Sequence, residues 1–210
     1  MFNADTLLFR EFVMAEPIPL ATIQEAVFHF LKGRDDVVIF GAQAVNAYVK
    51  EPRMTQDIDL ISTDAKTLSE ELRSHLHDQF HMAIRVRTVA KGRGFRLIQI
   101  QKTGNRHLID IRMAETLPAS QRMAEVLVML PSELVASKVI SYYQRRGKPK
   151  AGTDWRDIAL LLLVFPELKT EEGEVLARLK ASEVDVAVLN VWHEIVHQEI
   201  LTEEEDDKFL

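Results

Sequence analysis

The sequence contains no cysteine among its 210 residues. This absence excludes disulfide bonds, cysteine-ligated zinc, thiol nucleophiles and cysteine-bound iron–sulfur clusters. Long hydrophobic runs are also missing: the longest, Ile158–Phe165, has eight residues, whereas a membrane-spanning helix needs roughly 20. The first residues include Asp5, Glu11 and Glu16 and lack a basic start followed by an apolar stretch, so no secretory signal is expected. We therefore expect a cytoplasmic protein with no membrane partner.

An excess of positive charge is missing as well, because 26 basic residues stand against 32 acidic ones and the formal net charge is −6. This balance excludes a protein that coats nucleic acid through bulk charge. The distribution is uneven, however, since the segment 85–112 carries eight basic residues and one acid, Asp110. Two interpretations of this basic hairpin stay open. It is a surface that follows the phosphates of an RNA acceptor, or a solvated sheet edge that resists aggregation.

Hydrophobic periodicity predicts alternating helices and strands in the first half of the chain, followed by helices alone. The predicted helices are 20–32, 42–50 and 67–80. The predicted strands are 36–40, 57–62, 82–90, 94–101 and 107–112. After Pro118 the pattern is helical. We expect a mixed α/β or α+β core over 1–118, a C-terminal helical region over 119–202 and a solvated acidic tail over 203–210.

The residues with the clearest chemistry are Gly41-Ala42 and, further on, Asp57-Ile58-Asp59. Side chains alternate along a strand, so Asp57 and Asp59 project from one face. Two neighbouring carboxylates repel each other unless a cation lies between them, and Mg²⁺ prefers oxygen ligands. A strand that ends at Gly41 and continues as a helix offers backbone N–H groups to phosphate. This pairing of an anion site with a cation site is what a nucleoside triphosphate with magnesium needs.

A third carboxylate, Asp110, lies between two β-branched apolar residues in the predicted strand 107–112. If this strand lies beside the strand that carries Asp57, Asp110 joins the carboxylate cluster. Three acids could then hold two metal ions, one at the attacking hydroxyl and one at the triphosphate. The alternative is an acid that is simply paired with Arg112 or another nearby arginine.

The stretch from Gly41 to Asp59, with its Arg53-x-Thr55-x-Asp57-x-Asp59 strand, resembles the DNA polymerase β-type nucleotidyltransferase superfamily. It is most similar to the minimal bacterial branch that includes the AbiEii/AbiGii-type toxins. The resemblance implies a nucleotidyltransferase fold, a mixed sheet flanked by helices, and transfer of a nucleotidyl group from an NTP with two Mg²⁺ ions. It also implies a possible cognate antitoxin. Asp57, Asp59 and Asp110 are the implied metal-binding and catalytic residues.

A second block, Glu133 to Lys138 followed by the basic turn 145–150 and Asp154-x-x-Asp157, is similar to the helical motif of the same branch. The two blocks together imply a wider nucleotide-binding set. Its members are Gly41, Ala42, Gln43, Arg53, Thr55, Lys138, Asp154 and Asp157. For Lys138 the alternative is an ordinary surface lysine, and for Asp154 it is a residue that starts a helix.

Two other functions remain open. Ala42 stands where the family usually has glycine or serine, which favours a catalytically inactive module that binds nucleotide or a partner. His193-Glu194-Ile-Val-His197 fits the His-Glu-x-x-His pattern of zinc hydrolases. No further histidine follows at the expected spacing, so an amphipathic surface helix is the simpler interpretation.

Overall fold

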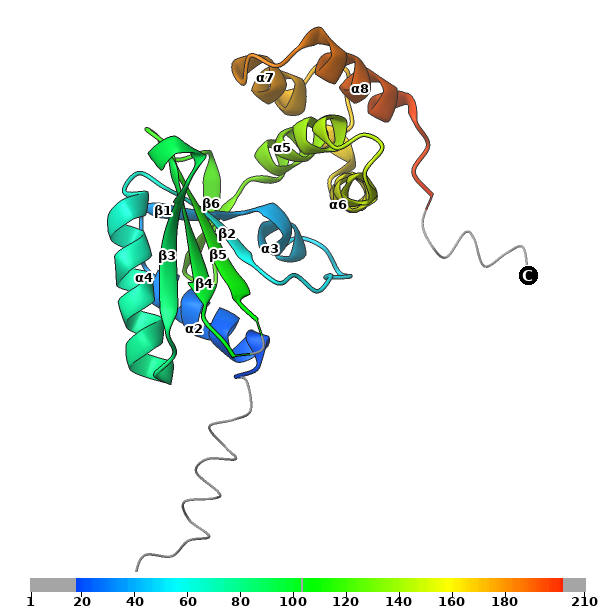
Figure 1. Ribbon diagram of the computed structural model, residues 1–210. Coiled ribbons are helices and arrows are strands. Elements are labelled where there is room, and N and C mark those ends of the chain that lie inside the picture. Colours follow the sequence, from blue (N-terminus) through cyan, green and yellow to red (C-terminus); the bar gives the residue numbers. More distant parts are fainter. Residues whose placement is uncertain (1–17, 103, 202–210) are drawn as a thin grey trace, which may run out of the picture.

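A seven-stranded mixed sheet forms the centre of the molecule, with helices on both sides (Figure 1). The computed structural model describes residues 18–102 and 104–201; the acidic N-terminal residues and the whole of the predicted acidic tail lie outside this part. The strand order is β3-β4-β5-β2-β1-β7-β6. The strands are β1 (Val37–Phe40), β2 (Ile58–Ser62), β3 (Ile84–Val89), β4 (Gly94–Gln99), β5 (Arg106–Met113), β6 (Ser120–Met123) and β7 (Val126–Met129).

The helices form two groups (Figure 1). Helices α2 and α4 contact each other, and α4 packs on β3, β4 and β5. The short helix α3 lies between the sheet and α5 and α6, and α5 also contacts α7 and α8. No helix in the described ranges is long and apolar enough to cross a membrane. The helices are α2 (Leu20–Leu31), α3 (Gly41–Asn46), α4 (Ala65–Phe80), α5 (Pro131–Gln144), α6 (Pro149–Val164), α7 (Glu174–Ala181) and α8 (Val186–His197), with short 3₁₀ turns η1 (Ala90–Gly92) and η2 (Pro166–Leu168).

Local sequence explains why α4 forms where it does. The Asp64 side chain accepts a hydrogen bond from the Thr67 backbone N–H at 3.1 Å and so caps the first turn. Leu68, Leu72 and Leu76 recur at helical spacing, and each is fully buried against the core. This burial removes three large apolar side chains from water, each contributing about 1.5–3 kcal/mol.

The sheet register places one row of side chains from the first strand to the far edge. Phe40 pairs with Asp59, Asp59 with Asp110, Asp110 with Arg96, and Arg96 with Arg87. Residues directly opposite each other on neighbouring strands share a face. The predicted adjacency of the Asp57 strand and the Asp110 strand is therefore confirmed, and the row continues onto arginines.

The expectation of a helix directly after Pro118 is wrong for residues 119–130. This segment forms the β6–β7 hairpin, which joins the sheet because Val128 pairs in parallel with Ile39. Ala124 and Glu125 both have positive φ, as in a type I′ turn, although neither is a typical residue for it. Helices begin only at Pro131, and we propose this residue as the start of the C-terminal helical region.

The predicted helix 42–50 is shorter in the structure and ends at Asn46. The Asn46 side chain accepts a hydrogen bond from the Arg53 backbone N–H at 3.0 Å and donates one to the Arg53 carbonyl at 2.8 Å. These two bonds fix the loop that leads into β2. Asn46 therefore positions the segment from which the carboxylates project.

Candidate active site

A pocket of about 790 Å³ opens between strands β2, β4 and β5 on one side and helices α5 and α6 on the other. Most of the residues that the two sequence motifs single out line this pocket. These are Gly41, Ala42, Arg53, Thr55, Asp57, Asp59, Asp110, Lys138 and Asp154. Residues that lie more than 100 positions apart in the sequence therefore face one cavity, as the motifs predict.

Gln43 is an exception among the expected phosphate-binding residues. It lines a different, smaller hollow of about 320 Å³ beside α2, together with Phe28 and His29. Its side chain is therefore not part of the main pocket. Only its backbone N–H remains as a candidate phosphate contact.

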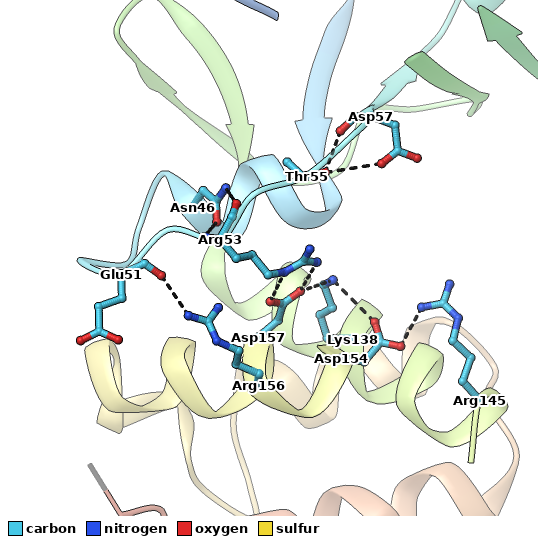
Figure 2. Close-up of polar contacts among 10 residues, drawn as sticks. All are labelled: Asn46, Glu51, Arg53, Thr55, Asp57, Lys138, Arg145, Asp154, Arg156 and Asp157. Carbon is cyan, nitrogen blue, oxygen red and sulfur yellow. Dashed lines mark hydrogen bonds and ion pairs between the residues drawn. The ribbon is translucent and has the colours of Figure 1, made fainter. Parts of the chain in front are cut away.

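Asp57 stands at the entrance to β2, where Thr55 organises the turn. The Thr55 hydroxyl donates a hydrogen bond to the Asp57 carbonyl at 3.0 Å and lies 3.4 Å from its Oδ1 (Figure 2). Thr55 thus holds the backbone from which the Asp57 side chain reaches the pocket. Thr55, which the sequence predicts to bind nucleotide, therefore positions Asp57 in the structure.

Gly41 and Asp59 are in direct contact. Gly41 has φ +69°, and a Cβ placed on it would lie 2.1 Å from Asp59 Oδ2. Both the left-handed backbone and the lack of space require glycine here. Burial and the neighbouring charge of Asp57 raise the pKa of Asp59 to about 6. The surroundings of Asp59 therefore disfavour its charged form, and a cation beside it would offset this effect.

Asp110 is paired with an arginine, as the alternative interpretation allows. Arg96 donates two hydrogen bonds to it, at 2.8 and 3.0 Å. Burial opposes ionisation, yet the Arg96 hydrogen bonds and the nearby His107 lower the pKa of Asp110. Asp110 is thus an ionised carboxylate with a resident counter-charge, placed beside Asp59.

His107 is a site residue that sequence reasoning missed. Its Nε2 lies 3.1 Å from Asp110 Oδ1 and its Nδ1 lies 3.6 Å from Asp57 Oδ2. Strict alternation would place residues 107 and 110 on opposite faces, but a register shift opposite Leu97 and Ile98 inserts one extra residue in β5. No sequence signal marks this bulge.

Lys138 and Asp157 form a buried ion pair under the pocket (Figure 2). Lys138 Nζ lies 2.6 Å from Asp157 Oδ2, and the Asp157 side chain is fully buried. Arg53 donates two more hydrogen bonds to Asp157, at 3.0 and 3.1 Å. Burial opposes the charge, but Arg53 and Lys138 together lower the pKa of Asp157. Lys138 is therefore not an ordinary surface lysine.

Asp154 links the same lysine to the basic turn. It lies 3.6 Å from Lys138 Nζ and accepts a hydrogen bond from Arg145 at 2.7 Å. The interpretation that Asp154 starts a helix is wrong, because α6 begins five residues earlier, at Pro149. Asp154 thus contacts the first residue of the basic turn 145–150, and its expected role in nucleotide binding stays a prediction.

The donor set of the pocket fits a divalent metal ion. Asp57, His107 and Asp110 each offer one ligand atom, and these atoms lie within 4.8 Å of one another. Asp59 lies two residues after Asp57, in β2. Carboxylate oxygens are the ligands that Mg²⁺ prefers. The neighbouring Arg112 and Lys138 add positive charge that suits a polyanionic substrate.

The structure does not favour the zinc hydrolase alternative, because the expected general base, Glu194, is paired with an arginine. Glu194 is exposed and pairs with Arg146 at 3.3 Å, on the outer surface of α8. His193 and His197 are also exposed, with 64% and 59% of their side-chain surfaces accessible. The two histidines nevertheless face a common acid, Glu171.

Comparison with protein families identifies the chain as a nucleotidyltransferase. The model of the family described as nucleotidyl transferase AbiEii toxin, type IV toxin–antitoxin system, matches residues 26–205. This match covers most of the sequence, so the chain belongs to the AbiEii nucleotidyltransferase family. Nucleotidyltransferases of this family generally use divalent metal ions. The family assignment favours an enzyme over a non-catalytic binding module.

Solved structures share the fold. The polyadenylate synthase of Megavirus aligns with a TM-score of 0.58 at 11% identity, over 70% of this chain and 32% of that one. The chain thus spans less than half the length of that enzyme. JHP933 from Helicobacter pylori aligns with a TM-score of 0.53 at 11% identity, over 92% of this chain and 97% of that one. No curated protein matches the sequence. Identities this low show the fold alone.

Proposed function

We propose that the protein transfers a nucleotidyl group from a nucleoside triphosphate to an acceptor hydroxyl. The hydroxyl oxygen attacks the α-phosphorus in line, the bond from that phosphorus to the β-phosphate bridging oxygen breaks, and pyrophosphate leaves. The observation that carries this proposal is that Asp57, Asp59 and Asp110, from the start of β2 and the middle of the adjacent parallel strand β5, line one pocket.

The three carboxylates would hold the metal ions, with Asp57 and Asp59 shared and Asp110 completing the second site. We propose two Mg²⁺ ions. When bound, they would neutralise the charge of the triphosphate and activate the acceptor oxygen. Asp59 suits this role because a bound cation offsets the burial and repulsion that raise its pKa. Asp110, ionised beside Arg96, is placed to accept the proton of the acceptor hydroxyl.

The triphosphate is proposed to lie between α3 and α5. Gly41 and Ala42 line this side of the pocket, and their backbone allows a close approach of phosphate. Lys138 faces the pocket from α5 while Asp157 and Asp154 hold its ammonium group in place. Arg53 and Asp157 connect the β2 loop to α6, so the two sides of the pocket are held at a fixed separation.

RNA is the acceptor that the charge distribution favours. The row that contains Asp59 and Asp110 continues through Arg96 to Arg87 on the edge strand β3. Arg85 shares the face of Arg87, and both are exposed. A polyanion that follows this row would arrive at the carboxylates with its terminal hydroxyl.

A role as the toxin of a toxin–antitoxin pair is also proposed, because the family is described by that role. If transfer causes toxicity, expression of the native chain should arrest bacterial growth, whereas Asp57→Asn should not. Co-expression of a cognate antitoxin should restore growth.

Transfer itself can be tested with each of the four NTPs labelled at the α-phosphate, incubated with Mg²⁺ and bulk tRNA. Label should become bound to RNA, and EDTA, Asp57→Asn and Asp59→Asn should each abolish this. Asp78→Asn, an exposed acid on α4, is the matched control and should retain full transfer. Undiminished transfer by both site variants would refute the proposed catalytic role. Label on protein instead of RNA would show that the acceptor is a protein.

A further inference from the structure

A second group of metal-ligating side chains lies outside the candidate active site, on the C-terminal helices. His193 and His197 are four residues apart on one face of α8, and Glu171 approaches both from the segment before α7. These three residues offer one ligand atom each, all within 4.8 Å of one another. We propose that they form a binding site for a divalent transition metal with the ligand preference of zinc.

The distances fit coordination by one ion. Glu171 Oε1 lies 3.0 Å from His197 Nε2 and 3.5 Å from His193 Nδ1. Zinc binds imidazole nitrogen and carboxylate oxygen at about 2.0–2.2 Å, so neighbouring ligands of a tetrahedral ion are about 3.4 Å apart. Two histidines and one glutamate are a frequent zinc ligand set, and water occupies the fourth position.

The orientation of His197 is already that of a metal ligand. Its Nδ1 lies 2.8 Å from the backbone carbonyl oxygen of His193. A carbonyl oxygen can only accept a hydrogen bond, so Nδ1 carries the proton. In the neutral imidazole this leaves the lone pair on Nε2, the atom that faces Glu171. A hydrogen bond from the other ring nitrogen is the usual support of a metal-binding histidine.

A neighbouring contact holds the glutamate segment against the end of α8. Lys169 Nζ donates a hydrogen bond to the Gln198 carbonyl at 2.6 Å. The segment between η2 and α7 is thus attached to α8 two residues before Glu171. The metal would add a second attachment between the same two elements.

The site lacks the free general base that a zinc hydrolase of the His-Glu-x-x-His type needs. The glutamate of the His-Glu-x-x-His pattern, Glu194, pairs with Arg146 in the turn between α5 and α6. It is therefore engaged away from the proposed ion. The metal would fix α8 to the segment before α7, while Arg146 connects α8 to the turn that follows α5, the helix that carries Lys138.

The test uses the full chain carrying Asp57→Asn, so that one ligand of the carboxylate pocket is removed. Titration with Zn²⁺ by calorimetry should show one ion bound per chain. Glu171→Gln and His197→Gln in this background should each weaken binding at least ~10-fold. The matched controls are Glu172→Gln, the adjacent exposed acid, and His29→Gln, an exposed histidine on α2. Both controls should retain the full affinity.

Co²⁺ gives an independent readout, because a four-coordinate site produces intense visible absorption bands. These bands should appear in the Asp57→Asn chain and in both controls and disappear in the Glu171 and His197 variants. Saturating Zn²⁺ should also raise the melting temperature by roughly 5–10 °C in the control chains only. Absence of a zinc equivalent, or equal binding by the Glu171 and His197 variants, would overturn the proposal.

Discussion

A carboxylate oxygen of Asp59 occupies the space that a side chain on Gly41 would need. A Cβ on Gly41 would lie 2.1 Å from Asp59 Oδ2. The glycine at the strand-to-helix turn and the carboxylate on the next strand therefore depend on each other. This contact connects the side of the pocket that is proposed to bind phosphate to the side that is proposed to hold the metal ions.

Gly41→Ala should abolish nucleotidyl transfer, because the new methyl group must displace Asp59. Gly33→Ala is the matched control, since Gly33 has a similar φ of +73° and no heavy atom within 4 Å of the added Cβ. Both variants should lose about 1–2 kcal/mol of stability from the left-handed backbone, and Gly41→Ala should lose more because Asp59 must move. Chemical denaturation and the transfer assay separate the two effects. Equal activity in both variants would show that the contact does not matter.

Asp59→Asn should stabilise the metal-free protein at neutral pH. Burial and Asp57 raise the pKa of Asp59 from 3.8 to about 6. The native state therefore binds the proton more tightly than the unfolded state, and stability falls as the pH rises from about 4 to about 6. The penalty is complete above about 6 and is at most about 3 kcal/mol.

Thermal denaturation in EDTA at pH 7.5 should accordingly give a higher melting temperature for Asp59→Asn than for the native chain. The difference should be largely lost at pH 3.5, where the Asp59 carboxyl is protonated in the folded state and mostly protonated in the unfolded state. Excess Mg²⁺ at pH 7.5 should stabilise the native chain more than the variant. A lower melting temperature for the variant in EDTA would contradict the strain inferred for Asp59.

Asp157→Ala should destabilise the protein by about 3–5 kcal/mol, because it leaves Arg53 and Lys138 without their buried counter-charge. Asp35→Ala removes the partner of Arg122 at a side chain that is 85% exposed, and should cost less than about 1 kcal/mol. Urea denaturation of the two variants provides the comparison. Similar losses would mean that the Asp157 network is not a structural link.

Arg85→Glu with Arg87→Glu should weaken RNA labelling through KM rather than kcat, because these side chains are proposed to guide the acceptor and not to react. The control is Lys66→Glu, an exposed lysine on α4, which packs on the opposite face of the sheet. The salt dependence of KM should also become shallower in the double variant. An unchanged KM would favour the alternative role of the hairpin as a protected sheet edge.

The parts of the site that the sequence predicts are those governed by regular alternation. The spacing of Asp57 and Asp59 places both on one face, and the third acid, Asp110, lies beside Asp59 as expected. His107 could not be found in this way, because a bulge changes its face. The length of the α3 helix was also overestimated, since the Asn46 side chain ends it by bonding the Arg53 backbone.

The β6–β7 hairpin shows a second limit of sequence patterns. Val126 and Met129 are spaced as on a helix, and the turn residues Ala124 and Glu125 are good helix formers with positive φ. Pairing of β7 with β1 overrides these local preferences. Likewise, the partners of Lys138 lie on another helix, so its buried state depends on tertiary packing.

The most direct test of the carboxylate pocket is the melting temperature of the native chain with each NTP, with and without Mg²⁺. Asp57→Asn is the site variant and Asp78→Asn the control. At about 100 times its dissociation constant, a ligand adds roughly 2.7 kcal/mol. The account predicts a Mg²⁺-dependent rise with at least one NTP in the native and Asp78→Asn chains and none in Asp57→Asn. No rise with any NTP, or an equal rise in Asp57→Asn, would contradict it.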